Sequence, residues 1–193
     1  MQTQSFKRAV LGLMALGLTL SMLAIFGCGG GDDNEVQRQA SLSGAGERPD
    51  PRTTPGTGTA VFIIENEEIR YELTYTGLRN VQQAHIHEGS DAVAGSIFLF
   101  LCANGALKAN APVPPPDCPA GSTVTVRGTL NESNLIRLPN ASVGGPPITN
   151  IGDAIAQIEA GNSYTNVHTD DGVAPQNTGP GDFPGGEIRG QNR

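Results

Sequence analysis

Three histidines are the residues of this chain best suited to chemistry, and they fall in two short segments. His85 and His87 form a His-x-His pair, and His168 is the third histidine. Residues two apart on a β-strand point to the same face, so His85 and His87 would project side by side, about 7 Å apart along the backbone. Converging imidazoles are typical ligands of Zn²⁺ and Cu²⁺. The sequence therefore indicates this pair, joined by His168, as the leading candidate site.

The segments that carry these histidines must be strands for that geometry to hold. Short apolar runs, either alternating or continuous, are separated by Gly, Pro and Asn along most of the chain, which is typical of strands. In the strand with the pair, Ala84 and Ile86 are expected to face the core and both histidines to face outward. The predicted strands cover residues 36–43, 60–65, 68–76, 81–87, 96–102, 123–130, 163–169 and 186–191.

One helix is predicted, over residues 151–160. Asn150 can cap it, and an apolar stripe of Ile151, Ile155 and Ile158 lines one face. Many short strands, one short helix and 26 glycines favour a mainly β chain folded as an antiparallel β-sandwich.

The first 27 residues have the pattern of an export signal. Lys7 and Arg8 precede an apolar run that ends at Gly27 and Cys28. This ending resembles the bacterial lipoprotein signal, in which the cysteine is lipidated and becomes the new N-terminus. The alternative is an ordinary cleaved signal peptide with Cys28 incidental.

The lipoprotein interpretation divides the chain into three parts. Residues 1–27 are the signal peptide, residues 28–36 are the lipidated Cys28 with a flexible polar tether, and residues 37–193 are the folded domain. Acyl chains would hold the protein on a membrane without spanning it. The glycine after Cys28 favours an outer membrane or cell surface over the inner membrane.

The charge of the exported part argues against a nucleic-acid partner. Removal of residues 1–27 leaves 10 basic and 19 acidic residues, a net charge of −9, with Lys108 as the only lysine. Neutralising phosphates needs clustered basic side chains, and the sequence has none. We therefore expect no nucleic-acid binding.

The remaining cysteines, Cys102 and Cys118, form a pair once Cys28 is assigned to the lipid. A disulfide between them is favoured in an oxidising compartment. Loop-closure entropy would make it worth about 3 kcal/mol. Two free thiols and two metal ligands are the competing interpretations.

Four segments of the chain together resemble a known family. In order they are residues 73–78 (LTYTGL), 84–89 (AHIHEG), 160–169 (AGNSYTNVHT) and 184–191 (PGGEIRGQ). They are similar to CHRD domains, a family named for repeats in the animal protein chordin and common in exported bacterial proteins. The resemblance covers roughly residues 39–191. It implies a β-sandwich of immunoglobulin-like or superoxide-dismutase-like type outside the cytoplasm. It does not imply a reaction or a ligand, because fold and function are inherited separately.

The His-x-His strand is also similar to the copper-ligand segment of copper/zinc superoxide dismutase. That enzyme needs six histidines and an aspartate for its two metals, and three histidines cannot build both sites. A single Cu or Zn site, formed by His85, His87 and His168 with Glu187, remains open.

A metal-free polar network is the favoured alternative for the same residues. In it the histidines are hydrogen-bonded to Glu187, Thr169 and loop carbonyls, and Arg189 completes the cluster. Arg189 favours the network, because a cation beside a divalent ion is unfavourable unless Glu187 neutralises it.

The sequence thus predicts a membrane-anchored, extracytoplasmic CHRD-domain lipoprotein that acts as a non-enzymatic binding or structural module of the cell envelope. Envelope components or other proteins are its expected partners, besides the membrane itself. A Cu- or Zn-binding protein that uses the three histidines is the alternative, and a mononuclear redox enzyme is a third hypothesis. No serine or aspartate lies in a recognisable nucleophile setting, so no catalytic residue is predicted.

Overall fold

The computed structural model describes residues 35–140, 142, 143 and 145–193. The predicted signal peptide, Cys28 and the tether up to residue 34 lie outside the described residues. Among the described residues, no helix has both the length and the apolar character needed to span a membrane.

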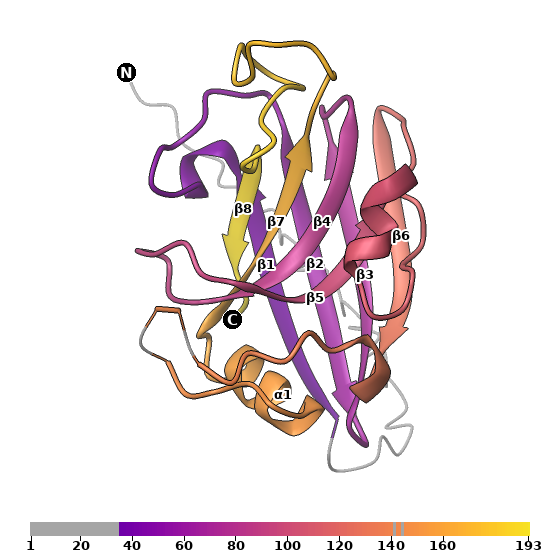
Figure 1. The fold of residues 1–193 in the computed structure, drawn as a ribbon, viewed down its shortest axis with the longest axis vertical. Coiled ribbons are helices and arrows are strands. Elements are labelled where there is room, and N and C mark those ends of the chain that lie inside the picture. The colour runs from indigo at the N-terminus through magenta and orange to yellow at the C-terminus, as the bar shows by residue number, and fades with distance from the viewer. Residues whose placement is uncertain (1–34, 141, 144) are drawn as a thin grey trace, which may run out of the picture. The chain divides into compact units, whose positions relative to one another are not determined.

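Eight antiparallel strands form one sheet in the order β5-β4-β7-β8-β1-β2-β3-β6 (Figure 1). The described helices are one α-helix, α1, and three short 3₁₀ turns. The strands are β1 (Val36–Ser43), β2 (Thr57–Glu65), β3 (Glu68–Thr76), β4 (Val81–Glu88), β5 (Ile97–Ala103), β6 (Thr123–Leu130), β7 (Ser163–Thr169) and β8 (Ile188–Gln191), and the helices are η1 (Gly44–Gly46), η2 (Gly105–Asn110), η3 (Glu132–Asn134) and α1 (Ile151–Glu159).

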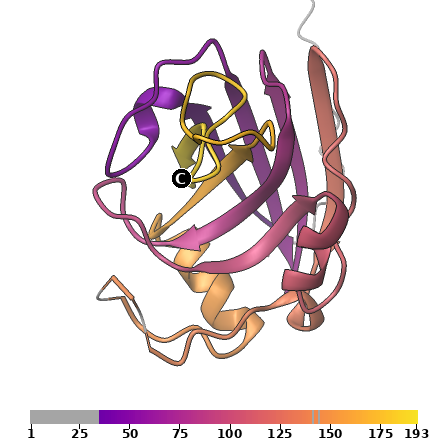
Figure 2. The same cartoon turned by 45° about the horizontal axis from the view of Figure 1, so that its top comes forward.

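The sheet has two four-stranded halves that meet at β8 and β1. The ladder between these two strands is short, with Ser43 paired to Arg189. The sheet curls until β3 approaches β5, and the Tyr71 hydroxyl donates to the Leu101 carbonyl at 2.5 Å (Figure 2). The mainly β, antiparallel prediction is confirmed, and the finer expectation of a two-sheet sandwich stays a prediction.

The β1-β2-β3-β6 half follows the alternating pattern of its sequence. In β3, Tyr71 and Leu73 are buried while Arg70 and Glu72 are exposed, as expected for a sheet with one wet face. A tight turn joins β2 to β3, with Asn66 and its neighbour at φ 51° and 60°, the backbone that two-residue hairpins require.

The other half buries both of its faces. Every residue of β7 is buried, and so is β4 from Ala84 to Glu88. β5 ends the strand order, yet its outer edge is covered, because the Ile136 amide donates to the Phe98 carbonyl at 2.9 Å. The prediction that His85 and His87 face outward is therefore wrong, because both side chains are buried.

Loops explain this burial. Residues 44–56, 89–96 and 170–187 gather on the histidine-bearing side of β4 and β7 (Figure 2). Backbone carbonyls of Gly95 and Pro184 in two of these loops bond directly to the histidines. Both histidines share one side of β4, as the spacing predicted, but that side is covered by chain rather than by water.

Two local features match their sequence signals. Asn150 accepts from the Asp153 amide at the start of α1, and the Asp153 carboxylate accepts from Asn150 in return, which is a capping box. Cys102 and Cys118 form the predicted disulfide, which ties the end of β5 to the Pro-rich segment after η2.

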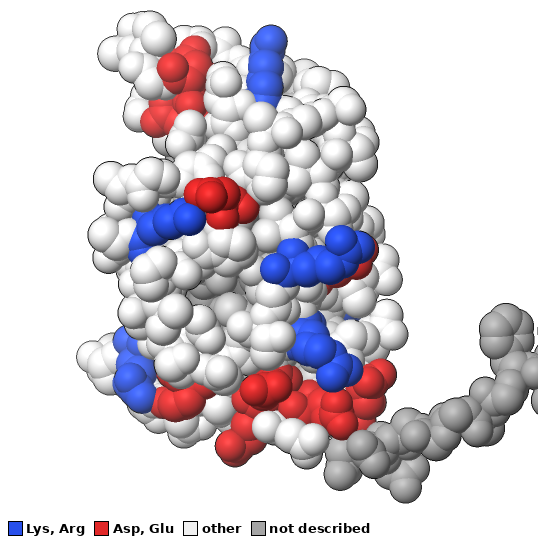
Figure 3. All heavy atoms as spheres, turned by 90° about the vertical axis from the view of Figure 1, so that its right-hand side faces the viewer, with Lys and Arg blue, Asp and Glu red and all other residues white. Residues whose placement is uncertain are grey.

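Surface charges on the β3–β6 side lie close to opposite charges. Figure 3 shows basic side chains scattered over this face, mostly next to acidic ones. Arg127 pairs with Glu72 at 2.7 Å, and Arg70 pairs with Glu65 at 3.3 Å. These pairs are solvent-exposed, so each contributes little to stability.

Candidate metal centre

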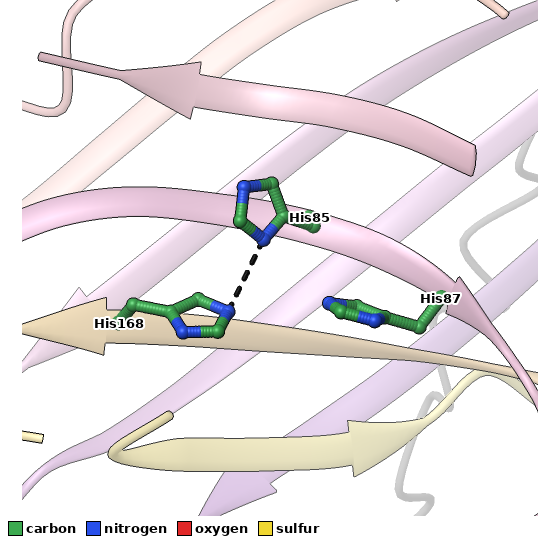
Figure 4. Close-up of side chains that lie close together, drawn as sticks. All are labelled: His85, His87 and His168. Atoms are coloured by element: carbon green, nitrogen blue, oxygen red, sulfur yellow. Dashed lines mark hydrogen bonds between the residues drawn. The ribbon is translucent and has the colours of Figure 1, made fainter. Parts of the chain in front are cut away.

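The three histidines come from neighbouring strands and face one another (Figure 4). In the β4–β7 ladder, Asn166 pairs with His85, and Tyr164 pairs with His87. His168 lies two residues beyond Asn166 on the same side of β7. One ring nitrogen from each histidine lies within 4.8 Å of the other two. The side chains are almost completely buried, with exposed fractions of 0% for His85 and 7% for both His87 and His168.

Two backbone carbonyls set the tautomers of two histidines. His87 Nδ1 lies 2.9 Å from the Gly95 carbonyl, and His168 Nδ1 lies 2.9 Å from the Pro184 carbonyl. A carbonyl only accepts, so Nδ1 must carry the proton in each ring, and the lone pair is left on Nε2. Histidines that bind metals are usually held in this way, with the second ring nitrogen donating to a carbonyl or carboxylate.

The third imidazole contacts the lone pair of His168. His85 Nδ1 lies 3.1 Å from His168 Nε2. Without a metal, the Nδ1–H of His85 donates to that nitrogen. With one, 3.1 Å is also the separation of two nitrogens that bind a single ion at about 2.0–2.1 Å with an angle of about 100° between them. The spacing therefore suits both states.

Two ring nitrogens in the cluster have no protein partner. Nε2 of His85 and Nε2 of His87 are buried without a hydrogen bond to any described residue. In Figure 4 the far end of the His87 ring points toward the gap beside His85 and His168. An unsatisfied buried nitrogen costs free energy, and a metal ion would satisfy the His87 lone pair.

Burial keeps all three imidazoles neutral at ordinary pH. Desolvation lowers the pKa of His87 to about 3 and that of His168 to about 4. The pKa of His85 falls well below its usual range, first because of burial and then because of the neighbouring His168 and His87. Neutral imidazole is the form that binds metals.

An aromatic and a cationic group close one end of the cluster. Tyr164 stacks on His87 with ring centroids 4.8 Å apart. The Arg189 guanidinium lies 3.4 Å from the Tyr164 ring centroid and donates to the carbonyls of Ser90 and Val93 at 2.7 and 2.8 Å. Arg189 thus holds the 89–96 loop over the histidines.

Glu47 is a buried carboxyl group whose pKa Arg189 affects. Its side chain is buried, and burial raises its pKa to about 7 against the opposing attraction of Arg189 and Arg52. The sequence had assigned this neutralising role to Glu187.

Glu187 lies in the site region but not among the histidines. Its carboxylate is buried and accepts from the Thr54 hydroxyl, from the Thr169 hydroxyl at 2.5 Å and from the Gly181 amide at 2.9 Å. It is absent from the group of ligand atoms around the three histidines. Because Glu187 precedes β8 and lies beside the end of β7, its side chain reaches the loops rather than the cluster.

The polar network predicted from sequence is therefore present in part. The Thr169–Glu187 bond and the bonds from histidines to loop carbonyls exist. No hydrogen bond joins a histidine to Glu187 or Thr169 within the described chain. The structure instead divides the polar groups into a histidine cluster and a separate Glu187 cluster.

Three contributing residues were given no role from sequence. The side-chain amide of Asn166 lies 2.9 Å from His168 Nε2, and Tyr164 stacks on His87. Because His168 Nε2 keeps a lone pair, the amide must present its NH2 group to that nitrogen. The alternation of Tyr164, Asn166 and His168 on one strand face was a usable signal for both. No sequence signal indicated Glu47, because it comes from a Pro- and Gly-rich loop far in sequence from the histidine-bearing strands.

The geometry defines a mainly β domain with a buried, neutral three-histidine cluster. A family model for the CHRD domain matches residues 38–192, so the chain belongs to the CHRD domain family. This membership suggests a binding module of extracytoplasmic type. No curated protein and no solved structure matches the chain significantly.

Proposed function

We propose that this protein is a lipid-anchored, non-enzymatic binding module of the cell envelope, built as a two-layer β-sandwich, and that it holds one Cu or Zn ion at the three-histidine cluster. The metal proposal rests on two imidazoles whose tautomers are fixed by backbone carbonyls. His87 and His168 each give Nδ1–H to a backbone carbonyl and keep the Nε2 lone pair for the centre of the cluster.

The donor set favours a borderline transition metal. Imidazole suits Cu and Zn, whereas Ca²⁺ and Mg²⁺ prefer oxygen ligands. Between the two, Cu²⁺ binds more strongly at a given nitrogen site. His85 Nδ1, His87 Nε2 and His168 Nε2 are the nitrogens that would bind the ion.

Binding a metal ion fits the site better than catalysing a reaction at that ion. The exposed fraction of the three side chains is at most 7%, which leaves little room for a substrate at the metal. The cation Arg189, one aromatic ring away from His87, lies at the closed end.

Metal analysis tests the proposal directly. Protein purified without a His tag is stripped, loaded with Cu²⁺ or Zn²⁺, dialysed and measured by mass spectrometry of the metal. We expect one ion per chain in the wild type. In His87→Ala the affinity should fall by more than the roughly 10–100-fold known for partners that merely orient such ligands. Thr125→Ala, a truncation on β6 away from the site, is the matched control.

The competing outcome is equally clear. A wild-type protein that is stable and retains no metal, with His87→Ala no different from Thr125→Ala, would show that the cluster is a hydrogen-bonded network and would overturn the metal proposal.

The anchor needs its own experiment, because it rests on Cys28 alone. Cells that express the wild type or Cys28→Ser are labelled with a radioactive fatty acid and fractionated. We expect label and outer-membrane location for the wild type, and unlabelled, released protein for Cys28→Ser. A wild type that stays unlabelled in the soluble fraction would overturn the anchor without touching the metal proposal.

A further inference from the structure

A cleft of about 440 Å³ opens beside the histidine cluster. Its walls come from β4, from η2 and from the segment that follows β7, and they include Gln83, Leu107, His168, Asp170 and Asp171. It is therefore a place where the almost closed site meets the surface.

The floor of the cleft continues into the cluster. Gln83 pairs with His168 in the β4–β7 ladder and precedes His85 by two residues on the same side of β4. His168 lines the cleft while its Nε2 contacts His85 Nδ1 at 3.1 Å. An ion that reached this floor would meet His168 first and the other two imidazoles next.

Carboxylates gather at the mouth of the cleft. Asp170 and Asp171 line it, and together with Asp182 they offer oxygens within 4.8 Å of one another. Asp182 is only 2% exposed, and its Oδ1 has no hydrogen-bond partner among the described residues. The residues that line the cleft include no lysine or arginine. The charged residues that line the mouth are therefore both acidic.

A guanidinium lies at the opposite end of the cluster. There the Arg189 guanidinium lies over Tyr164, which stacks on His87. A cation approaching from that end meets repulsion and the 89–96 loop, to which Arg189 is bonded. These charges favour a cation at the aspartate end of the site and disfavour one at the Arg189 end, so an ion would approach the histidines from the aspartate side.

We propose that this cleft is the entry route for the metal ion, and that Asp170 and Asp171 capture the hydrated cation before His168 takes it up. This inference rests on the proposed metal site and adds the path and the residues that control the loading rate. Charged clefts of this kind raise the association rates of oppositely charged ligands by about 10–1,000-fold.

The test compares loading rates in the full protein with Cu²⁺ as the probe. The chain has three tyrosines and no tryptophan, and Tyr164 touches His87, so quenching of tyrosine emission in a stopped-flow instrument reports binding. Asp170→Asn/Asp171→Asn preserves the side-chain oxygens that accept from the Gly172 and Val173 amides. We expect it to load at least about tenfold more slowly at low salt, with equilibrium affinity unchanged.

Two controls make the result specific. Glu67→Gln/Glu68→Gln, at the β2–β3 turn, changes the net charge equally and should load at the wild-type rate. The difference caused by the aspartates should disappear at about 0.5 M NaCl, where the screening length falls to roughly 4 Å.

The outcomes separate the two proposals. A wild type that shows no quenching and retains no Cu²⁺ overturns the metal site and the entry route with it. A wild type that loads one ion while Asp170→Asn/Asp171→Asn loads equally fast, or slows no more than the Glu67/Glu68 control, leaves the metal site standing and overturns the entry route alone.

Discussion

The two halves of the sheet bury their strands in different ways. In the β1-β2-β3-β6 half, β3 turns apolar side chains to the core and charged ones to water. In the β5-β4-β7-β8 half, β4 and β7 are buried on both sides, and the second side is polar. The first half is stabilised mainly by apolar burial. The second half is stable only because its buried polar groups form hydrogen bonds to loops. Those same loops enclose the site.

Lowering the pH should reveal the difference between the two halves most strongly, through the free energy of unfolding. The folded pKa values of His87 and His168, about 3 and 4, lie below the usual 6.5. Below pH 6.5 the unfolded chain therefore binds protons that the folded chain does not, so the free energy of unfolding falls as pH falls toward 4. We expect a histidine contribution on the order of 5 kcal/mol between pH 7 and 4.5, partly offset by Glu47.

Urea denaturation across this pH range is the measurement. His168→Gln should flatten the pH dependence by about one proton, because it removes one titrating group. Equal slopes for the variant and the wild type would contradict the assignment of this dependence to the cluster.

A cavity in the apolar half should lower the free energy of unfolding slightly less than acidification does. This loss should not depend on pH. Leu73 on β3 is fully buried. Leu73→Ala is expected to lower the free energy of unfolding by about 4 kcal/mol at every pH between 5 and 8. Glu72→Ala, the exposed neighbour, should change it by less than about 1 kcal/mol. If Leu73→Ala lowered the free energy of unfolding by more at low pH than at high pH, packing in the apolar half would depend on the charge of the histidines.

The disulfide lies on the buried half, at the end of β5. It closes a loop with a sequence separation of 16, so Cys102→Ala/Cys118→Ala should lose about 3 kcal/mol. Thermal unfolding with and without reductant measures the loss. A wild type whose unfolding is insensitive to reductant while the double variant is destabilised would point to packing instead of the crosslink.

Glu47 should produce an effect similar in size to that of the disulfide, and opposite in its pH dependence to that of the histidines. Burial raises its folded pKa to about 7 from 4.5, so the folded chain binds the extra proton, and stability falls as pH rises from 4.5 through 7. Glu47→Gln keeps the shape and removes this loss, so it should be more stable than the wild type by about 3 kcal/mol at pH 8. At pH 5 the two should be nearly equal, and a destabilised variant at pH 8 would instead assign Glu47 a stabilising ion pair with Arg189.

Prediction from sequence succeeded where the signal was local. The bounds of β1, β3, β6 and β7 agree with those expected from alternation, and α1 begins after the capping residue Asn150. Strand periodicity and capping depend on residues within a few positions of each other, so no knowledge of the rest of the chain was needed.

Prediction failed where the partner came from far away. Glu187 and Arg189 were expected to meet each other and the histidines. Glu187 instead bonds to Thr54, which is 133 positions away in sequence, and Arg189 acts on the pKa of Glu47. No pattern along β8 could indicate which loop would lie over it.

The sequence by itself determined the strand set, the helix and the placement of two histidines on one side of a strand, and it favoured the pairing of Cys102 with Cys118. Only the tertiary structure decided that this side is buried, that the carbonyls of Gly95 and Pro184 orient the rings, and that a cleft with two aspartates opens beside His168. The physical reason is the separation in sequence over which each interaction acts. Backbone periodicity acts between near neighbours, whereas desolvation and hydrogen-bond partners depend on loops that the fold brings together from distant parts of the chain.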